Sequence, residues 1–243
     1  SPRVSGGFSY SSALRSIPIF ALENPEHYVT ALLRLFSNDL MGNGLTYSGW
    51  HNYLEAPLFS IGLLPLLLLP QIFTLFSGRR LIVYASLLAV FSIPVIFPYF
   101  RYAFFLFSGD YYRVFSLFAA LPLLFLGLYA LDEIERKGRV NRYVLSGTFL
   151  VLAAMLYFPY HTKITNINIT DGAIAFFQNT NGMLSVDAGL RLVISLFLVA
   201  YAALIFFLSS ARSKSFVRVL LLGAVIAEIG YMNSISLEDR RTL

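Results

Sequence analysis

Long apolar stretches separated by short polar segments recur along most of the chain. After a region of mixed polarity over residues 1–53, we predict six membrane-spanning helices, each close to the roughly 20 residues that cross the hydrocarbon core of a bilayer. Their expected ranges are about 55–77, 81–99, 114–131, 143–160, 188–209 and 216–233. The pattern therefore predicts an all-α, polytopic integral membrane protein.

The region before the first predicted span contains an amphipathic segment, "NPEHYVTALLRLFSNDL". Asn24 is placed to cap a helix, and Pro25 suits its first turn. The apolar residues that would share one face are Val29, Leu32, Leu33 and Phe36. Such a helix is expected to lie in the plane of the membrane interface. We accordingly divide the chain into an interfacial segment (1–53), a transmembrane domain (54–235) and a tail (236–243).

Basic residues sort the connections between the predicted spans into two classes. The short loops after the first, third and fifth spans hold nine of the 18 Lys and Arg residues. Short loops rich in Lys and Arg stay on the cytoplasmic side of a membrane. The N-terminal region, residues 100–113, residues 161–187 and the tail are therefore expected to face outward, with both termini extracytoplasmic.

Composition excludes several classes of function. Only 13% of the residues are charged, and the mean hydropathy is +0.70. The net charge of +5 is spread over short loops, so membrane topology explains it better than a nucleic-acid partner does. The chain has no Cys, which excludes disulfides and thiol chemistry, and its three His residues lack a metal-binding spacing. We predict no metal site and no cofactor.

The stretch "GWHNYLEAP" gathers polar and aromatic groups at the entrance of the first predicted span. Trp50 and Tyr53 fit the aromatic belt at a membrane–water interface. Glu55 fits the first turn of a helix, where the helix dipole favours a carboxylate. Alternatively, His51 and Glu55 share a helical face and act in acid–base chemistry, with Asn52 beside them. Both interpretations stay open at the level of the sequence.

Two further places combine charge with apolar surroundings. In "YFRYAFFLFSGDYYR", Arg101 and Arg113 flank Asp110. Either an Asp–Arg pair holds this segment together, or the guanidinium groups bind a lipid-linked phosphate, which suits their bidentate geometry. Glu228 lies inside the last apolar span. An intramembrane carboxylate is costly, so we expect it to face a polar interior with a partner, such as an outward-facing Arg.

Three stretches resemble a known family. "LFSNDLMGNGLTYSGWHNYLEAPLFSIGLLPLLLLP" and "FPYFRYAFFLFSGDYYRVFSLFAALPLLFLGLYAL" resemble the middle of YfhO-like bacterial membrane proteins. The closing "IAEIGYMNS" resembles the Glu and Asn that end a later span in that family. The likeness covers residues 30–135 and 220–235. The positions that follow the family pattern are Asn52, Tyr53, Glu55, Arg101 and Glu228.

The family is similar to GT-C glycosyltransferases, which take a sugar from a polyprenyl-phosphate carrier on the outer face. The resemblance implies such an enzyme, or part of one, in a bacterial inner membrane, with membrane lipid and the lipid-linked sugar as partners. Arg101 and Arg113 would hold the carrier phosphate, and Trp50 would stack on a sugar ring. Glu55 and His51 are the candidates for catalysis, orienting sugar or acceptor hydroxyls. The predicted substrate-binding residues are Trp50, Asn52, Tyr53, Arg101, Asp110, Arg113 and Glu228.

The chain departs from the family pattern at the catalytic loop. In GT-C enzymes the catalytic Asp usually lies in the first outer loop, after a first membrane helix. Asp39 is the only Asp before the first predicted span, and we do not assign it as the base. The chain begins with Ser, so we expect a piece of a longer protein. The alternative prediction is a non-catalytic membrane subunit that packs into a larger complex with other membrane subunits. A transporter is disfavoured, because the spans carry few polar residues near the bilayer midplane.

Overall fold

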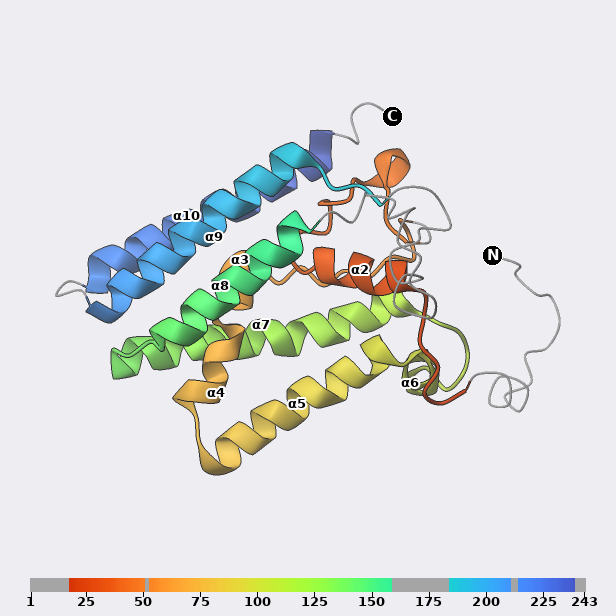
Figure 1. The fold of residues 1–243 in the computed structure, drawn as a ribbon, viewed down its shortest axis with the longest axis horizontal. Coiled ribbons are helices and arrows are strands. Elements are labelled where there is room, and N and C mark those ends of the chain that lie inside the picture. The colour runs from red at the N-terminus through yellow and green to blue at the C-terminus, as the bar shows by residue number, and fades with distance from the viewer. Residues whose placement is uncertain (1–17, 51–52, 159–183, 211–213, 239–243) are drawn as a thin grey trace, which may run out of the picture.

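The computed structural model describes residues 18–50, 53–158, 184–210 and 214–238, and these ranges contain helices but no strand (Figure 1). The prediction of an all-α fold is confirmed for this part of the chain. The helices, with η for 3-10 turns, are α2 (Pro25–Leu33), η1 (Gly44–Thr46), α3 (Leu63–Leu68), η2 (Leu69–Gln71), α4 (Ile72–Leu75), α5 (Gly78–Ile96), α6 (Pro98–Phe104), α7 (Tyr112–Lys137), α8 (Arg142–Tyr157), α9 (Ala188–Ser210) and α10 (Lys214–Glu238).

Four of these helices are long and apolar enough to cross a membrane, namely α5, α7, α9 and α10. Their length and composition indicate a helical integral membrane protein. The predicted number of six spans is not borne out in the described ranges. The helix at the predicted fourth span, α8, has only 16 residues, and the predicted first span is not one helix.

The apolar run of the predicted first span is broken and lies inside the bundle. Residues 56–62 are not helical, and α3, η2 and α4 follow as three short pieces. Gly62 has a φ of 88°, which only glycine adopts readily, and Pro70 lies within the 3-10 turn η2. All six side chains of α3 are buried. Helix α3 is therefore apolar on every side because protein surrounds it.

The close approach of α7 to α3 depends on Gly127. A Cβ atom added at this position would lie 2.6 Å from Cβ and 2.7 Å from Cα of Pro65. Small residues allow such backbone contacts between helices in membranes. Gly127 therefore lets the long helix α7 pack directly against the buried short helix α3.

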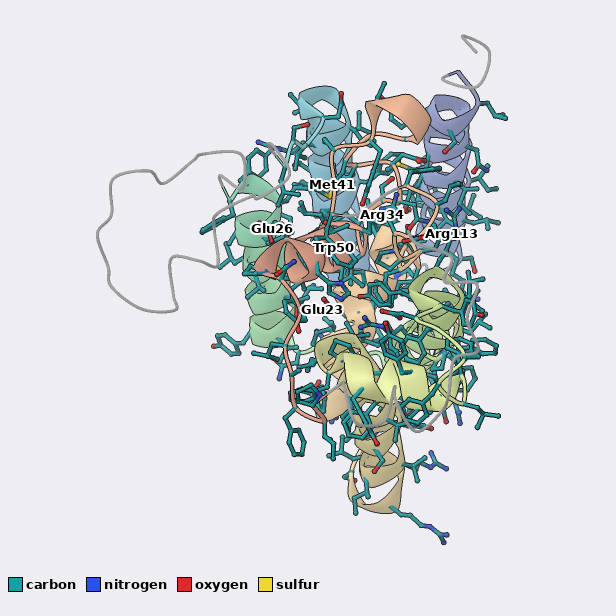
Figure 2. All side chains as sticks on the ribbon, turned by 90° about the vertical axis from the view of Figure 1, so that its right-hand side faces the viewer. Glu23, Glu26, Arg34, Met41, Trp50 and Arg113 are labelled. Atoms are coloured by element: carbon teal, nitrogen blue, oxygen red, sulfur yellow. The ribbon has the colours of Figure 1, made fainter. Side chains whose placement is uncertain are left out.

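The two ends of the bundle differ in character (Figure 1). The start of α5, the α7–α8 connection and the start of α10 lie together at what we call the basic end, residues 77–80, 136–142 and 215–218. Residues 18–50, 53–57, 97–112 and 184–187 form the opposite end, which faces the viewer in Figure 2. The sequence grouping of the basic loops is thus matched in space, while the side of the membrane that each end faces stays a prediction.

Helix α2 is packed inside the opposite end rather than lying on a membrane surface. Asn24 does occupy the N-cap and Pro25 the first turn, as predicted. However, the polar side chains Glu26, His27 and Thr30 are buried, whereas Leu32 of the predicted apolar face is 39% exposed. Since protein covers the polar side chains that an interfacial helix would turn to water, the predicted interfacial orientation is wrong.

Contacts from distant segments explain this burial. The His27 ring stacks on Tyr112 of α7, with centroids 4.5 Å apart. The Thr30 hydroxyl accepts a hydrogen bond of 2.8 Å from the Trp50 backbone N–H. These partners lie 20 or more positions away along the chain, so the local apolar pattern of α2 does not reveal them.

Candidate functional site

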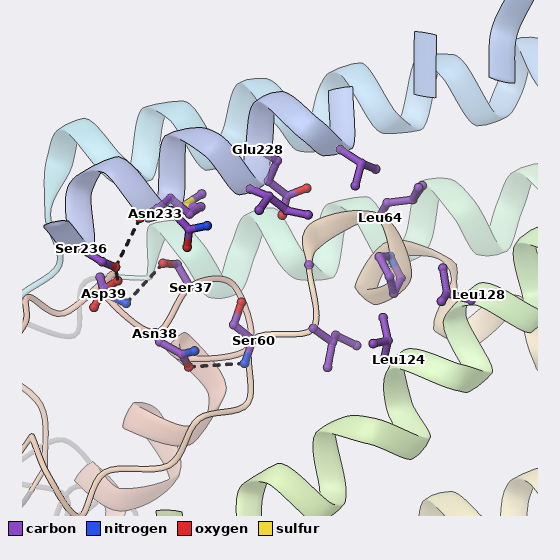
Figure 3. A pocket seen from close by; sticks show the side chains of 16 residues that line it. Ser37, Asn38, Asp39, Ser60, Leu64, Leu124, Leu128, Glu228, Asn233 and Ser236 are labelled. Atoms are coloured by element: carbon purple, nitrogen blue, oxygen red, sulfur yellow. Dashed lines mark hydrogen bonds between the residues drawn. The ribbon is translucent and has the colours of Figure 1, made fainter. Parts of the chain in front are cut away.

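A cavity of about 530 Å³ lies between α10, α3, α7 and the segment that follows α2 (Figure 3). One part of its wall is polar, formed by Ser37, Asn38, Asp39, Glu228, Asn233 and Ser236. The other part is apolar, formed by Leu64, Leu124, Leu128, Ile229 and Met232. Leu128 and Ile229 are 49% and 55% exposed on candidate membrane helices, so the apolar part reaches the lipid-facing surface of the bundle.

The segment after α2 places Asp39 in this cavity. Phe36 and Leu40 are buried in the apolar core and anchor the segment on either side of the polar residues. The Asp39 backbone N–H donates to the Ser37 hydroxyl at 3.3 Å. The carboxylate of Asp39 accepts a hydrogen bond from the Ser236 hydroxyl of α10. Apolar anchoring and a link to α10 therefore hold this carboxylate at the cavity wall.

Helix α10 supplies the facing wall through residues at helical spacing. Glu228, Met232 and Ser236 are four positions apart and share one face. The Glu228 carboxylate accepts hydrogen bonds from the Leu63 backbone N–H at 2.9 Å and from the Tyr201 hydroxyl at 2.6 Å. The expectation that Glu228 has a partner is confirmed, but these partners are an amide and a phenol instead of an Arg. The Leu63 amide is one of the donors that a helix start leaves without an intrahelical acceptor.

A second cavity, of about 640 Å³, adjoins the first at the opposite end of the molecule. Its wall includes the polar residues Asn43, Thr46, Ser48, Ser185 and Asp187. Asp39 is the only described residue that lines both cavities. Asp39 therefore lies between a first cavity with a polar and an apolar part and a second cavity that is lined by polar and apolar residues in similar number.

Arg101 on α6 is fully buried, and protein groups surround its guanidinium. Nε and Nη2 donate to the two carboxylate oxygens of Asp110 at 2.9 and 2.8 Å. Nη1 donates to the Pro94 carbonyl at 3.0 Å, and Nη2 lies 3.4 Å from Glu23. The group also lies 4.2 Å from the centroid of the Tyr112 ring. This geometry favours the interpretation in which an Asp–Arg pair holds the segment together, with Arg101 as the partner of Asp110.

The Arg101 cluster holds two carboxylates for one guanidinium. Burial raises the pKa of Glu23, and the charge of Arg101 opposes this shift. Burial alone would lower the pKa of Arg101, but hydrogen bonds and charge from Asp110 outweigh it and raise the value. Arg101 is therefore held in its charged form.

Arg113, Tyr53 and Trp50 lie at the opposite end but do not line either cavity. Nη1 of Arg113 donates to the carbonyls of Tyr53 at 2.9 Å and Leu54 at 3.2 Å. Its guanidinium lies 5.5 Å from the centroid of the Tyr53 ring. The Trp50 carbonyl accepts a hydrogen bond from the Tyr47 hydroxyl at 3.0 Å. These contacts hold the backbone at Trp50 and at Tyr53–Leu54, so two of the predicted substrate-binding residues have a structural role.

Of the other predicted residues in this loop, His51, Asn52 and Glu55, the structure describes only Glu55. Glu55 is exposed and lies in a turn, eight positions before the start of α3. The expectation that it occupies the first turn of a helix is therefore wrong, because the helix begins only after Gly62. His51 and Asn52 lie outside the described residues.

Sequence reasoning missed Asp39, Ser236 and Tyr201 as site residues. A signal for Asp39 was present, since the polar triplet 37–39 interrupts residues that are otherwise apolar. Ser236 follows Glu228 at helical spacing, which a face-by-face inspection of α10 would have found. The partnership of Tyr201 with Glu228 joins two helices, and no local pattern predicts it.

Comparisons with protein-family models, curated proteins and solved structures found no match to this chain. The resemblance to YfhO-like proteins therefore stays a prediction.

Proposed function

We propose that this protein is a membrane glycosyltransferase, or part of one, which moves a sugar from a polyprenyl-phosphate carrier to an acceptor glycan or lipid at the outer surface. The observation that supports this proposal best is the position of Asp39 between the two cavities. A transferase needs one group that reaches both a lipid-linked donor and a polar acceptor. Asp39 meets this requirement.

The first cavity suits a donor that is both polar and apolar. Its volume of about 530 Å³ falls within the roughly 300–1,000 Å³ of typical ligand sites. Its apolar wall reaches the exposed side chains of Leu128 and Ile229, where an isoprenoid chain would lie among membrane lipids. Its polar wall at Asn38 and Asn233 offers hydrogen bonds to sugar hydroxyls. The second cavity then receives the acceptor.

In this proposal Asp39 acts as the general base, in place of Glu55 or His51. The acceptor oxygen attacks the anomeric carbon of the donor sugar, and Asp39 takes the proton of the attacking hydroxyl. The bond between the anomeric carbon and the phosphate oxygen breaks, and polyprenyl phosphate leaves with the electron pair. Glu228 is not assigned as the base, because its two oxygens already accept hydrogen bonds from Leu63 and Tyr201.

The test is turnover of a lipid-linked sugar by the full-length protein in membranes. The D39N variant is expected to consume radiolabelled polyprenyl-phosphate hexose about a hundredfold more slowly than the wild type, since a positioned general base contributes roughly 10²–10⁴-fold. The matched control is D132N, because Asp132 is exposed on α7 near the basic end and lines neither cavity. Turnover by D132N is expected to equal that of the wild type.

Two outcomes would contradict the proposal. Unchanged turnover in D39N would remove Asp39 from the reaction. If the full-length wild type consumes no lipid-linked sugar and instead co-purifies with stoichiometric membrane partners, the chain is a non-catalytic subunit.

A further inference from the structure

Among the described residues, two arginines are completely buried, and their surroundings differ in one respect. Arg101 and Arg34 each have a relative exposure of 0%. Nη1 of Arg101 donates to a backbone carbonyl, while its Nε and Nη2 form a fork that holds both oxygens of Asp110. A carboxylate in this fork is the usual bidentate partner of a guanidinium. Arg101 thus shows how this fold compensates a buried arginine.

Arg34 repeats this arrangement without the carboxylate. Its Nη1 donates to the Pro57 carbonyl at 2.8 Å. Its Nε and Nη2, the same fork that Arg101 uses, are buried and have no hydrogen-bond acceptor. Among the described residues, no carboxylate lies at ion-pair distance from Arg34. A buried charge without a partner is strongly unfavourable. An oxyanion bound at Nε and Nη2 would supply both the missing acceptors and the opposite charge.

Aromatic rings frame Arg34 and bring a second arginine to the same place. The Arg34 guanidinium lies 5.0 Å from the Tyr47 ring centroid and 5.4 Å from that of Tyr53. The guanidinium of Arg113 lies 5.5 Å from the same Tyr53 ring. Figure 2 shows Arg34 and Arg113 at the opposite end of the molecule. No described carboxylate pairs with Arg113 either.

We propose that Arg34, supported by Arg113, binds a phosphate group through its Nε and Nη2 fork. Two guanidinium charges around one tyrosine ring match the charge of a phosphate better than that of a single carboxylate, and planar forks suit its oxygens. The site contains none of the residues that line the two cavities, and it exists whether or not the transfer reaction takes place.

The electrostatics of Arg34 agree with a missing anion. Burial lowers the pKa of Arg34, and the charge of Arg113 acts in the same direction, while Tyr47, Tyr53 and Asp39 oppose it only in part. Arg101, buried to the same degree but paired, has a raised pKa. A bound phosphate would supply Arg34 with a negative charge and two acceptor oxygens, as Asp110 does for Arg101.

The phosphate can belong to a lipid headgroup or be free in solution, and the two sources can be told apart with two probes. Inorganic phosphate and dodecyl phosphate are titrated separately into the full chain in dodecyl maltoside, with potassium chloride at matched ionic strength as the blank. The readout is the fluorescence of Trp50, the only tryptophan. The Trp50 carbonyl accepts a hydrogen bond from the hydroxyl of Tyr47, and the Tyr47 ring lies beside Arg34. No labelling is needed.

Three variants give the test its controls. R34M is expected to bind the responding probe about tenfold more weakly or worse, because a hydrogen-bonded charge pair is lost. R34K keeps the charge but not the fork, and is expected to bind with intermediate affinity. R136M removes an arginine that is 69% exposed at the basic end, and should bind like the wild type. If R34M does not fold, the comparison of R34K with the wild type carries the test.

Each result has a defined meaning. A saturable response to inorganic phosphate that weakens in R34M and R34K supports the site and shows that free phosphate is accepted. A response to dodecyl phosphate alone, with the same dependence on Arg34, supports the site and assigns the phosphate to a lipid. No response to either probe, or equal affinity in R34M and the wild type, overturns it. Because binding is measured instead of turnover, failure here is distinct from failure of the transferase proposal.

Discussion

Arg101 binds two carboxylates, Asp110 and Glu23, in a cluster where all three side chains are at least three-quarters buried. Removing one partner from a buried ion pair is strongly destabilising, because the remaining charges stay buried without a compensating charge. The three groups come from the segment before α2, from α6 and from the segment before α7. The cluster therefore joins the parts of the opposite end, and its stability is measurable.

Replacing Arg101 by Met is expected to lower the free energy of unfolding by about 3–5 kcal/mol, because Asp110 and Glu23 are left without their cation. Denaturant titration in detergent, followed by circular dichroism, measures the change. The control is R136M, since Arg136 is 69% exposed and lies 3.9 Å from Glu133. An exposed pair of this kind contributes about 1 kcal/mol or less. Equal effects of the two substitutions would contradict the assignment.

The pH dependence of the free energy of unfolding tests whether the pKa of Glu23 is raised in the folded protein. Below its ordinary pKa of 4.5 the carboxyl is protonated in the folded and unfolded chain alike. As the pH rises above 4.5, the unfolded chain releases its proton first, because burial raises the pKa of Glu23 in the fold. The folded state then holds more protons, so this group lowers stability with rising pH until its folded pKa is passed.

The E23Q variant has no such proton to lose. Its free energy of unfolding, relative to the wild type, is therefore expected to increase from about pH 4.5 upward and then to level off above the folded pKa of Glu23. Denaturant titrations of both proteins over about pH 4 to 8 measure the difference. A difference that does not vary with pH would show that the pKa of Glu23 is not raised.

At the scale of elements, the contact between α3 and α7 is the one most sensitive to a single atom. G127A is expected to destabilise the protein by about 1–3 kcal/mol, the usual cost of overpacking, because the new Cβ would meet Pro65 at 2.6 Å. The matched control is G147A in α8, where no neighbouring atom lies within 4 Å. Here Ala is expected to be neutral or slightly stabilising. Thermal denaturation in detergent compares the two, and a similar melting temperature for both would contradict the contact.

The elements also show where prediction from sequence succeeds and where it fails. The ranges of α5, α7, α9 and α10 follow from apolar run length, since lipid contact requires a long apolar helix. The run at 55–77 is equally apolar but forms the short pieces α3, η2 and α4, of which α3 is completely buried in protein. Burial in protein and burial in lipid select the same residue types, so the pattern cannot separate them.

At the candidate site, the sequence predicts that a carboxylate is buried with a hydrogen-bonding partner, but it does not predict which residue the partner is. Burial of Glu228 with a partner follows from the cost of an intramembrane carboxylate. The identity of that partner, the Leu63 amide, depends on where α3 begins, which the sequence pattern placed too early. Arg34 escaped notice because nothing in its neighbourhood along the chain marks it as buried. Only the packing of Tyr47 and Tyr53 around it does so.

At the scale of the whole molecule, the basic end and the opposite end define an orientation that chemical labelling can test. The chain has no cysteine, so single cysteines report without a background. Arg79 at the basic end and Ser108 at the opposite end are both exposed. In intact cells a membrane-impermeant maleimide is expected to label S108C but not R79C, and to label both after permeabilisation. The reverse pattern would show that the basic end faces outward.

The hydrogen bond between Glu228 and the Leu63 amide also constrains how the protein is made. The two residues are 165 positions apart, and the acceptor is synthesised long after the donor. An amide without an acceptor is costly in hydrocarbon. While the nascent chain grows, α3 cannot rest stably in lipid until α10 has left the ribosome and docked. The start of α3 is thus completed by a side chain of α10, which makes the docking of α10 a late step in the assembly of this bundle.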